Sequence, residues 1–238
     1  MHLKRYSMPE SWPLPKKAKV YVATPMPGPH AKMASIPLKI IVRDVLKLAE
    51  TAEEAKKILN SGKVMVDKKV RKEPNFPVGL MDVFEIPEIH LRFRISPGRK
   101  GLGLEKIREE ETKTKLCRIE GKTTLRKGIT QLNLHDGRCI ITKTSSYRVG
   151  DSIIIEIPEQ KILSHFSLKK GEPCFIIAGR NTGTMGRIKE IKERKGMLEK
   201  STIAIETEKG KAIETLKEYV MVGTPESEEE KRPKKEKA

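Results

Sequence analysis

The sequence predicts an α+β, multidomain protein rather than a chain with one large core. Only 37% of the 238 residues are hydrophobic and 34% are charged, which leaves little apolar side chain for a single large interior. Residues 37–90 have helical and then strand periodicity, whereas residues 91–222 have mostly strand patterns separated by turns. A small helix-helix-hairpin domain, a β-rich central domain and a further β domain are therefore expected in that order.

The net charge points to a polyanionic partner. Lys and Arg number 49 against 32 Asp and Glu, which gives a net charge of +17. The excess is uneven, because residues 1–35 hold six Lys and Arg against one Glu, and residues 91–165 hold sixteen against nine. Nucleic acid is the usual partner of such a chain. The sequence contains no apolar run long enough for a membrane span and no signal-peptide core, so we expect a cytoplasmic protein.

The composition gives little support for a metal site, a disulfide framework or an enzymatic function. The three cysteines form no Cys-x-x-Cys pair and the five histidines are scattered, so we expect neither a metal site nor a disulfide framework. We also expect no catalytic residue, no cofactor and no small-molecule substrate. Aromatic residues are only 4% of the chain, which favours contacts to phosphates and to folded RNA shape over a base-stacking sheet.

Residues 1–36 predict an extended basic arm. Prolines recur through it, including the run Pro25-Met-Pro-Gly-Pro29, and they disfavour both a helix and a central strand. We expect the arm to become ordered on a partner surface. Its candidate RNA-binding residues are Lys4, Arg5, Lys16, Lys17 and Lys19.

Residues 37–90 predict two helices followed by a short hairpin. Four apolar residues recur three or four positions apart, as on one helix face: Leu38, Ile41, Val45 and Leu48. Thr51 and Glu54 have the capping-box spacing that begins a helix near Ala52, and Gly62 suits the end of that helix. Short strands are then expected at 63–67, 70–72 and 82–86.

Two runs in this segment are specific, VRDVLKLAETAEEAKKILNSGKVMVDKKV and PVGLMDVFEI. They resemble the S-four-type RNA-binding domain, a helix-helix-hairpin module found in ribosomal proteins, pseudouridine synthases, RNA methyltransferases and some tRNA synthetases. The resemblance implies a basic RNA-binding face, which here would contain Arg43, Lys47, Lys56, Lys57, Lys63, Lys68 and Lys69. Many members have Ser-Arg at the start of the second helix, where this chain has Ala52-Glu53, and the acidic residues of the domain imply a modest affinity for RNA.

Residues 91–167 predict the β-rich central domain, with the strand content of a small barrel or sandwich. Strands are expected at 91–95, 117–119, 130–134, 139–142 and 152–156. Only residues 104–115 have a helical pattern, and turn residues such as His135-Asp-Gly137 separate the strands.

The glycine-rich segment Pro97–Lys106 could be a nucleotide-binding loop by its position, because it follows one expected strand and begins the expected helix. A P-loop is disfavoured because Leu104 stands where its lysine belongs. A dinucleotide fingerprint is disfavoured because Lys106 stands where Gly or Ala belongs. We expect instead a glycine loop that lies on phosphates, with Arg99 and Lys100 as its charges.

Residues 168–222 begin with two expected strands, 173–178 and 185–191, around a glycine-rich turn. The turn and the start of the second strand contain Gly179, Gly183 and Gly186, an arrangement that resembles a KOW motif. The resemblance implies an SH3-like barrel, as in ribosomal proteins and transcription-elongation factors, with four residues directed towards phosphate: Arg180, Asn181, Arg187 and Lys189. Further strands are expected at 202–206 and 219–222.

The order of the modules is more specific than either resemblance alone. Residues 1–222 resemble the archaeal-eukaryotic small-subunit ribosomal protein family S-four-e. The resemblance rests on this order of segments: an arm that begins HLKR, a PGPH segment, the S-four-type domain, a β-rich middle and a KOW hairpin. A short tail, residues 223–238, is expected to be disordered, and the composition resembles archaeal members. The resemblance implies a non-catalytic constituent of the small ribosomal subunit that binds small-subunit ribosomal RNA, contacts neighbouring ribosomal proteins and supports assembly and translation.

Two functions from other classes stay open. An RNA-modifying enzyme could use the S-four-type domain as a guide, but it would need a catalytic Asp in an enzymatic domain or a cofactor-binding α/β domain, and the β-rich remainder matches neither. A transcription or translation factor could use the KOW hairpin to bind RNA transiently, but no apolar partner-binding patch stands out in the sequence.

Overall fold

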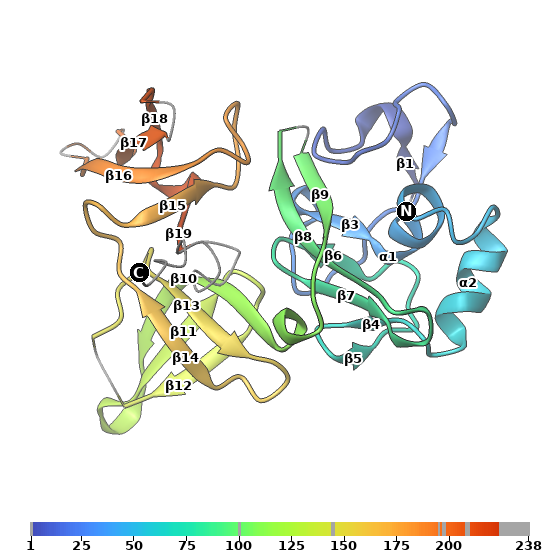
Figure 1. The fold of residues 1–238 in the computed structure, drawn as a ribbon, viewed down its shortest axis with the longest axis horizontal. Helices are drawn as coiled ribbons and strands as arrows, with labels where there is room; N and C mark the ends of the chain where they lie inside the picture. The colour runs from blue at the N-terminus through green and yellow to red at the C-terminus, as the bar shows by residue number, and fades with distance from the viewer. Residues whose placement is uncertain are drawn as a thin grey trace, which may run out of the picture.

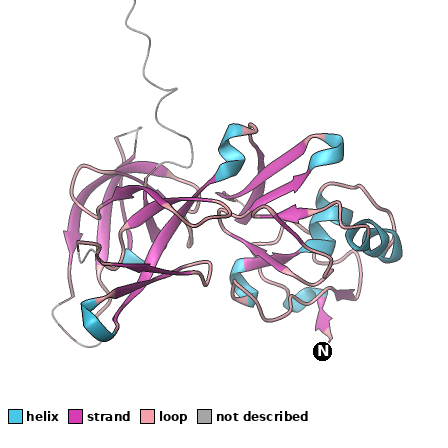
Figure 2. Ribbon diagram, turned by 90° about the horizontal axis from the view of Figure 1, so that it is seen from below, coloured by secondary structure: helices cyan, strands magenta, loops and turns pink. Residues whose placement is uncertain are grey.

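The structure is a computed structural model, and it describes residues 2–99, 101–143, 146–194, 196, 199–207 and 210–223. Strands far outnumber helices in the described part, as Figure 2 shows. One lobe is built from residues up to about 106, and a second lobe follows it along the chain (Figure 1). No helix of the described residues is long and apolar enough to cross a membrane.

The segment predicted as an extended arm is folded against the first lobe instead. Its strands β1 (Leu3–Lys4) and β2 (Tyr21–Val22) pair antiparallel. Met8 and Trp12 are buried, and the Trp12 indole N–H donates to the Ser35 carbonyl at 2.7 Å. The proline pattern excluded an α-helix correctly, but scattered apolar side chains between the prolines are enough to anchor the segment, although most of its residues are exposed.

The first predicted helix is shorter than its apolar spacing indicates. After β3 (Ser35–Pro37), α1 (Leu38–Ile40) continues directly into η3 (Ile41–Val45), a π-helical turn. Lys47 then adopts a left-handed φ of 54°, which ends the helical path. Leu38 and Ile41 are nevertheless fully buried, so the predicted inward face is correct.

The second predicted helix is confirmed. It is α2 (Ala52–Asn60), on the outer side of the first lobe (Figure 1). The Glu54 backbone N–H donates to the Thr51 hydroxyl at 3.2 Å, and the Glu54 carboxylate accepts from the Thr51 backbone in return. Gly62 follows with a φ of +77°, as the end of a helix requires.

A five-stranded sheet supports the two helices and extends beyond the predicted domain. Its order is β5-β4-β7-β8-β9, from β4 (Met65–Val66), β5 (Lys69–Val70), β7 (Val83–Ile86), β8 (Leu91–Gly98) and β9 (Gly101–Lys106). A separate pair joins β3 to β6 (Pro77–Gly79). The boundary expected at residue 90 therefore falls inside one sheet.

The helix expected over residues 104–115 is wrong. Residues up to 106 belong to β9, and Glu110–Lys113 forms only a 3-10 turn, η5. The glycine-rich segment is thus the turn of the β8–β9 hairpin rather than a strand-to-helix loop. Strand β9 has glycine at positions 101 and 103 and therefore few side chains. It lacks the alternation of apolar and polar side chains from which a strand is predicted.

The second lobe contains two antiparallel sheets. The first has the order β12-β11-β10-β13-β14 and consists of β10 (Thr114–Thr124), β11 (Thr130–Leu134), β12 (Cys139–Thr142), β13 (Ser152–Glu156) and β14 (Ile162–Phe166). The second has the order β18-β17-β16-β15-β19 and consists of β15 (Pro173–Ile176), β16 (Met185–Lys192), β17 (Thr202–Thr207), β18 (Ala212–Leu216) and β19 (Val220–Val222). Every strand expected after residue 116 lies in these sheets, and β14 and β18 are additional.

Short 3-10 turns connect the strands: η1 (Arg5–Ser7), η2 (Lys32–Ala34), η4 (Pro87–Ile89), η6 (Arg126–Gly128) and η7 (Lys217–Tyr219). Apolar packing joins the lobes, because Leu116, Phe175 and Met221 of the second lobe belong to the buried cluster of the first. Apart from Gly223, the tail expected to be disordered lies outside the described residues.

Candidate nucleic-acid interface

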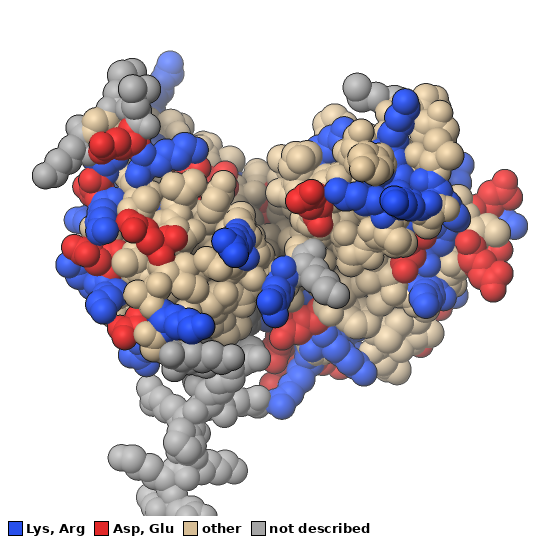
Figure 3. All heavy atoms as spheres, turned by 90° about the horizontal axis from the view of Figure 1, so that it is seen from above, with Lys and Arg blue, Asp and Glu red and all other residues tan. Residues whose placement is uncertain are grey.

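Most of the cations expected to bind RNA are on the surface. Lys and Arg side chains occur on both halves of the molecule in the face seen in Figure 3, with Asp and Glu side chains among them. The exposed candidates are Lys4, Lys16, Lys17, Lys19, Lys47, Lys56, Lys57, Lys63, Lys69, Arg99, Arg180, Arg187 and Lys189, together with Asn181. Lys100 lies outside the described residues. Two of these lysines already have surface partners, because Lys16 pairs with Glu10 at 3.3 Å and Lys63 with Glu88 at 2.6 Å.

Three other expected cations are engaged inside the protein. Arg5 is only 4% exposed and its Nε donates to the Pro15 carbonyl at 2.7 Å, so it fixes the fold of the arm rather than facing solvent. Arg43 is half-buried and pairs with its neighbour Asp44. Lys68 is half-buried as well and lies 2.7 Å from a Glu85 carboxylate oxygen.

The two glycine-rich turns that the sequence singled out are brought together in space. Gly183, in the β15–β16 turn, has a φ of +81°, and a Cβ there would lie 2.6 Å from the Pro97 carbonyl oxygen in the β8–β9 hairpin. Gly101, at the same hairpin, has a φ of +113° and its backbone approaches that of Ser11 too closely for any side chain. The arm, the hairpin and the C-terminal sheet therefore meet backbone to backbone.

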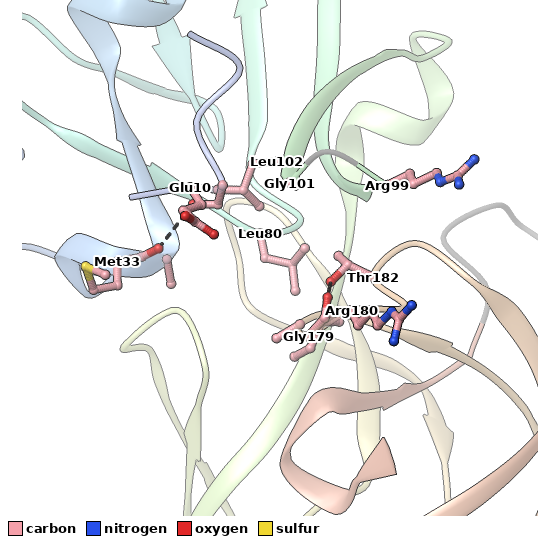
Figure 4. Close-up of a pocket in the computed structure, with 13 residues that line it drawn as sticks. Glu10, Met33, Leu80, Arg99, Gly101, Leu102, Gly179, Arg180 and Thr182 are labelled. Atoms are coloured by element: carbon pink, nitrogen blue, oxygen red, sulfur yellow. Dashed lines mark hydrogen bonds between the residues drawn. The ribbon is translucent and has the colours of Figure 1, made fainter. Parts of the chain in front are cut away.

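A cavity of about 640 Å³ lies at this meeting point, which we call the junction cavity. Leu80, Leu102 and Ile177 supply apolar walls, and the η2 turn of the arm forms a further side. Arg99 and Arg180 belong to the same lining, and in Figure 4 their guanidinium groups point to one side, away from the cavity. Two cations from turns about eighty residues apart in the sequence therefore lie at the same end of the cavity.

A second group of charges is buried between the lobes, which we call the ion cluster. The Lys115 side chain is 0% exposed. Its Nζ lies 2.5 Å from Asp82 Oδ1, 2.8 Å from Asp67 Oδ2 and 3.0 Å from Asp136 Oδ2. Arg138 Nη2 lies 2.7 Å from the same Asp67 oxygen.

The ion cluster also holds the arm, because His30 Nε2 lies 3.0 Å from Asp82 Oδ1. Burial by itself would raise the pKa of Asp82, but Lys115 and His30 outweigh it and hold that pKa well below its usual value. Burial by itself would lower the pKa of Lys115, but the surrounding carboxylates raise it by more than burial lowers it. The pKa of Lys115 is therefore well above its usual value. Lys115 also lowers the pKa of Asp136, whereas burial and the neighbouring Asp82 raise the pKa of Asp67. The contacts of Lys115 and His30 tie the arm, the first sheet and β10 into one body.

Burial and the nearby Lys115 charge lower the pKa of His135 to about 4. The neutral ring is held by two backbone groups, since its Nε2 lies 3.2 Å from the Leu80 carbonyl and its Nδ1 accepts from the Arg118 N–H at 3.2 Å. Neither the ion cluster nor any other part of the described chain groups His, Cys, Asp and Glu in a way that could hold a metal ion.

The ion cluster and a second charged region were not predicted from the sequence. Lys115 lies two and four residues before Cys117 and Ile119, on the same buried face of β10, and that alternation was its only signal. A cavity of about 670 Å³ between the two sheets of the second lobe is lined by two glutamates, Glu120 and Glu218, and by four cations: Arg118, Arg194, Lys200 and Lys217. These cations come from separate segments and no motif links them.

The class of protein follows from the helix pair, its hairpin and the surrounding sheets. Residues 38–84 match the S4 domain, an RNA-binding module, within a strand-rich multidomain chain. Residues 1–33 match the RS4NT domain and residues 89–162 match the ribosomal family S4e. The chain belongs to this S4e family of ribosomal proteins.

Similar proteins agree with that assignment over most of the chain. A protein of Methanothermobacter thermautotrophicus named small ribosomal subunit protein eS4 is 46% identical over 222 residues, which cover 93% of this chain and 91% of the relative. The protein of the same name from Methanocaldococcus jannaschii is 42% identical over 229 residues, 93% of each chain. The crystal structure of 30S ribosomal protein S4e from Thermoplasma acidophilum superimposes with a TM-score of 0.68 at 32% identity, covering 79% of this chain and 94% of that one.

Proposed function

We propose that the protein is a structural constituent of the small ribosomal subunit and binds its ribosomal RNA through several basic modules. The observation that carries this proposal is the 46% identity, over 93% of the chain, to a relative named small ribosomal subunit protein. The proposed partners are small-subunit ribosomal RNA and neighbouring ribosomal proteins, and the proposed place of action is the ribosome in the cytoplasm. The role is assembly and stability of the subunit rather than catalysis.

The charge distribution supports binding by many phosphate contacts. Exposed cations occur on the arm, on α2, on the hairpins and on β16, so one RNA site would meet several separate contacts. Each contact releases counterions, and the affinity therefore falls steeply with salt. Contacts of this kind position the protein without reading bases.

The ion cluster supports recognition of one folded RNA site. Because Lys115 joins three aspartates from both lobes, the lobes do not rotate freely and the surface cations keep fixed spacings. A rigid pattern of cations fits one arrangement of RNA helices better than others, which provides specificity without base contacts.

We also propose that the C-terminal sheet is an SH3-like barrel of the KOW type. The five-stranded sheet β18-β17-β16-β15-β19 supports this proposal, because it contributes one cluster of buried residues: Cys174, Ile176, Ile188, Ile203, Ile205, Val220 and Val222. Gly179 and Gly183 have φ values of +91° and +81° in the turn, and Gly186 packs directly against the Glu206 backbone. Arg180 and Asn181 are exposed at that turn, where a KOW hairpin would meet RNA.

Sedimentation tests the proposed function. Lysate of cells that express the protein is run on sucrose gradients at low and at high salt, and the protein is followed by immunoblot. We expect stoichiometric migration with the small subunit at low salt, and release only at a salt concentration that strips ribosomal proteins. A protein that stays near the top of the low-salt gradient would contradict the proposal and favour a transiently bound factor.

A further inference from the structure

The junction cavity has the features of a site for one unstacked nucleotide. We propose that it takes up a single base that is flipped out of the RNA, with the phosphates of that nucleotide on Arg99 and Arg180. The inference rests on the proposed function, since it presumes that RNA is the partner. It adds a contact of a different kind to the phosphate contacts, because an unpaired base is bound by its face.

The size and lining of the junction cavity suit a nucleobase. Its volume of about 640 Å³ is within the usual range for small organic groups, about 300–1,000 Å³. Leu80, Leu102 and Ile177 offer apolar surface, on which the flat face of a base can be buried without an aromatic partner. A duplex could not use this surface, because its bases are stacked inside the helix and only its backbone reaches a protein cavity.

The charges at the junction cavity favour a nucleotide over an apolar protein side chain. Arg99 and Arg180 are exposed and form no ion pair with any residue in the described ranges. In Figure 4 they lie at one end of the cavity, whereas Glu10 and Met33 lie at the other, and Glu10 is paired with Lys16. Two guanidinium groups at one end of an apolar hollow, without an ion-pair partner among the described residues, match the phosphates of a nucleotide whose base enters the hollow, and guanidinium planes also stack on bases.

The walls of the junction cavity are held in place without a ligand. Gly101 and Gly183 hold the hairpin against the arm and the β15–β16 turn. The Thr182 hydroxyl donates to the Gly179 carbonyl at 2.5 Å, and the Ser11 hydroxyl donates to the Met33 carbonyl at 3.3 Å. A preformed cavity loses little conformational freedom on binding, so a single base can add appreciable affinity.

Filling the cavity tests the proposal without changing the charge. Ala34 lines the cavity and is exposed, so Ala34→Phe can place a ring there with little effect on folding. Ala212→Phe is the matched control at an exposed position of β18 outside the cavity. The full-length protein is titrated, with fluorescence anisotropy, against a short fluorescent single-stranded RNA of mixed sequence and against the same RNA as a duplex.

We expect Ala34→Phe to weaken binding of the single strand by about tenfold and to leave binding of the duplex unchanged. The control should bind both probes like the wild type. Equal binding of the single strand by Ala34→Phe and the wild type would overturn the proposal. An equal loss for both probes would also overturn it, because that result indicates phosphate contacts alone.

A second variant tests the proposal if Ala34→Phe does not fold. Arg180→Lys keeps the charge and removes the planar guanidinium, so we expect a larger loss for the single strand than for the duplex. Equal effects on the two probes would again contradict a base site. If the wild type bound neither RNA, the proposed function itself would fail, and the base site with it; if it bound both and the variants did not discriminate, only the base site would fail.

Discussion

The ion cluster and the junction cavity both place cations between segments that are far apart in the sequence, yet the two regions treat charge in opposite ways. In the ion cluster, Lys115 is fully buried and has three carboxylate partners. At the junction cavity, Arg99 and Arg180 are exposed and have no ion-pair partner among the described residues. Buried charge joins the lobes, whereas exposed charge is left available for a ligand.

The difference follows from solvation. A charge removed from water loses several kcal/mol of hydration and is tolerated only with close partners. A charge at the surface keeps its hydration and gains little from an ion pair. Removal of a buried cation should therefore affect stability, and removal of an exposed one should affect binding.

The largest expected effect on stability comes from Lys115→Met. The methionine keeps most of the length of the side chain but removes the ammonium, and among the described residues it leaves the three buried aspartates with Arg138 and His30 as their remaining basic partners. We expect the free energy of unfolding to fall by about 3–5 kcal/mol. The measurement is urea denaturation followed by circular dichroism.

Lys189→Met is the matched control for this change. Lys189 is exposed on β16, and its replacement should change the free energy of unfolding by no more than about 0.5 kcal/mol. Similar effects of the two substitutions would mean that the ion cluster does not join the lobes.

A smaller effect is expected from acid, through His135. Its pKa is about 4 in the folded protein against 6.5 as the reference value, so between these pH values the unfolded chain binds more protons than the folded one. Stability therefore falls as the pH drops from 6.5 to 4, and this contribution levels off below pH 4. We expect a loss of about 1–3 kcal/mol over that window, measured by urea denaturation at a series of pH values.

His135→Gln isolates this contribution, because glutamine keeps a donor and an acceptor but does not titrate in the window. Its unfolding free energy should depend less on pH between 6.5 and 4 than that of the wild type. Parallel pH profiles for the two proteins would show that His135 takes no part in the acid response.

Local signals in the sequence predicted much of the fold. The helix over 52–60 was found from Thr51 and Glu54, which begin it by their own hydrogen bonds. Most strands were found from alternation, and the S4 domain from a long specific run. The arm was misjudged because its few apolar residues, such as Met8 and Trp12, have no period and are buried only by contact with distant strands.

The candidate interface was only partly predictable for the same reason. Arg99 and Arg180 were each chosen from a glycine-rich turn, but nothing in either turn indicates that Gly183 packs on Pro97. Lys115 could not be distinguished among 49 Lys and Arg residues except by its position on the buried face of β10. Long-range packing determines which cation is inside and which is outside, and a single sequence does not reveal that packing.

The smallest expected effect on stability, and the clearest on binding, comes from the double substitution Arg99→Met and Arg180→Met. Both side chains are exposed, so the free energy of unfolding should change by no more than about 0.5 kcal/mol. The slope of log affinity against log salt is negative, and each lost phosphate contact should reduce its magnitude by about one, hence the double variant by about two. The slope is measured by filter binding to small-subunit ribosomal RNA over a range of salt concentrations.

Lys115→Met provides the reciprocal comparison in the same assay. Its folded fraction should keep the wild-type salt slope although its stability is much lower, because Lys115 is fully buried and touches no phosphate. The two variants therefore separate stability from phosphate contacts: Lys115→Met lowers the free energy of unfolding at an unchanged salt slope, and the double arginine variant changes the salt slope at an unchanged free energy of unfolding. If the double arginine variant kept the wild-type slope, the exposed cations of the junction cavity would not meet RNA phosphates, and the division between buried and exposed charge would not correspond to a division of function.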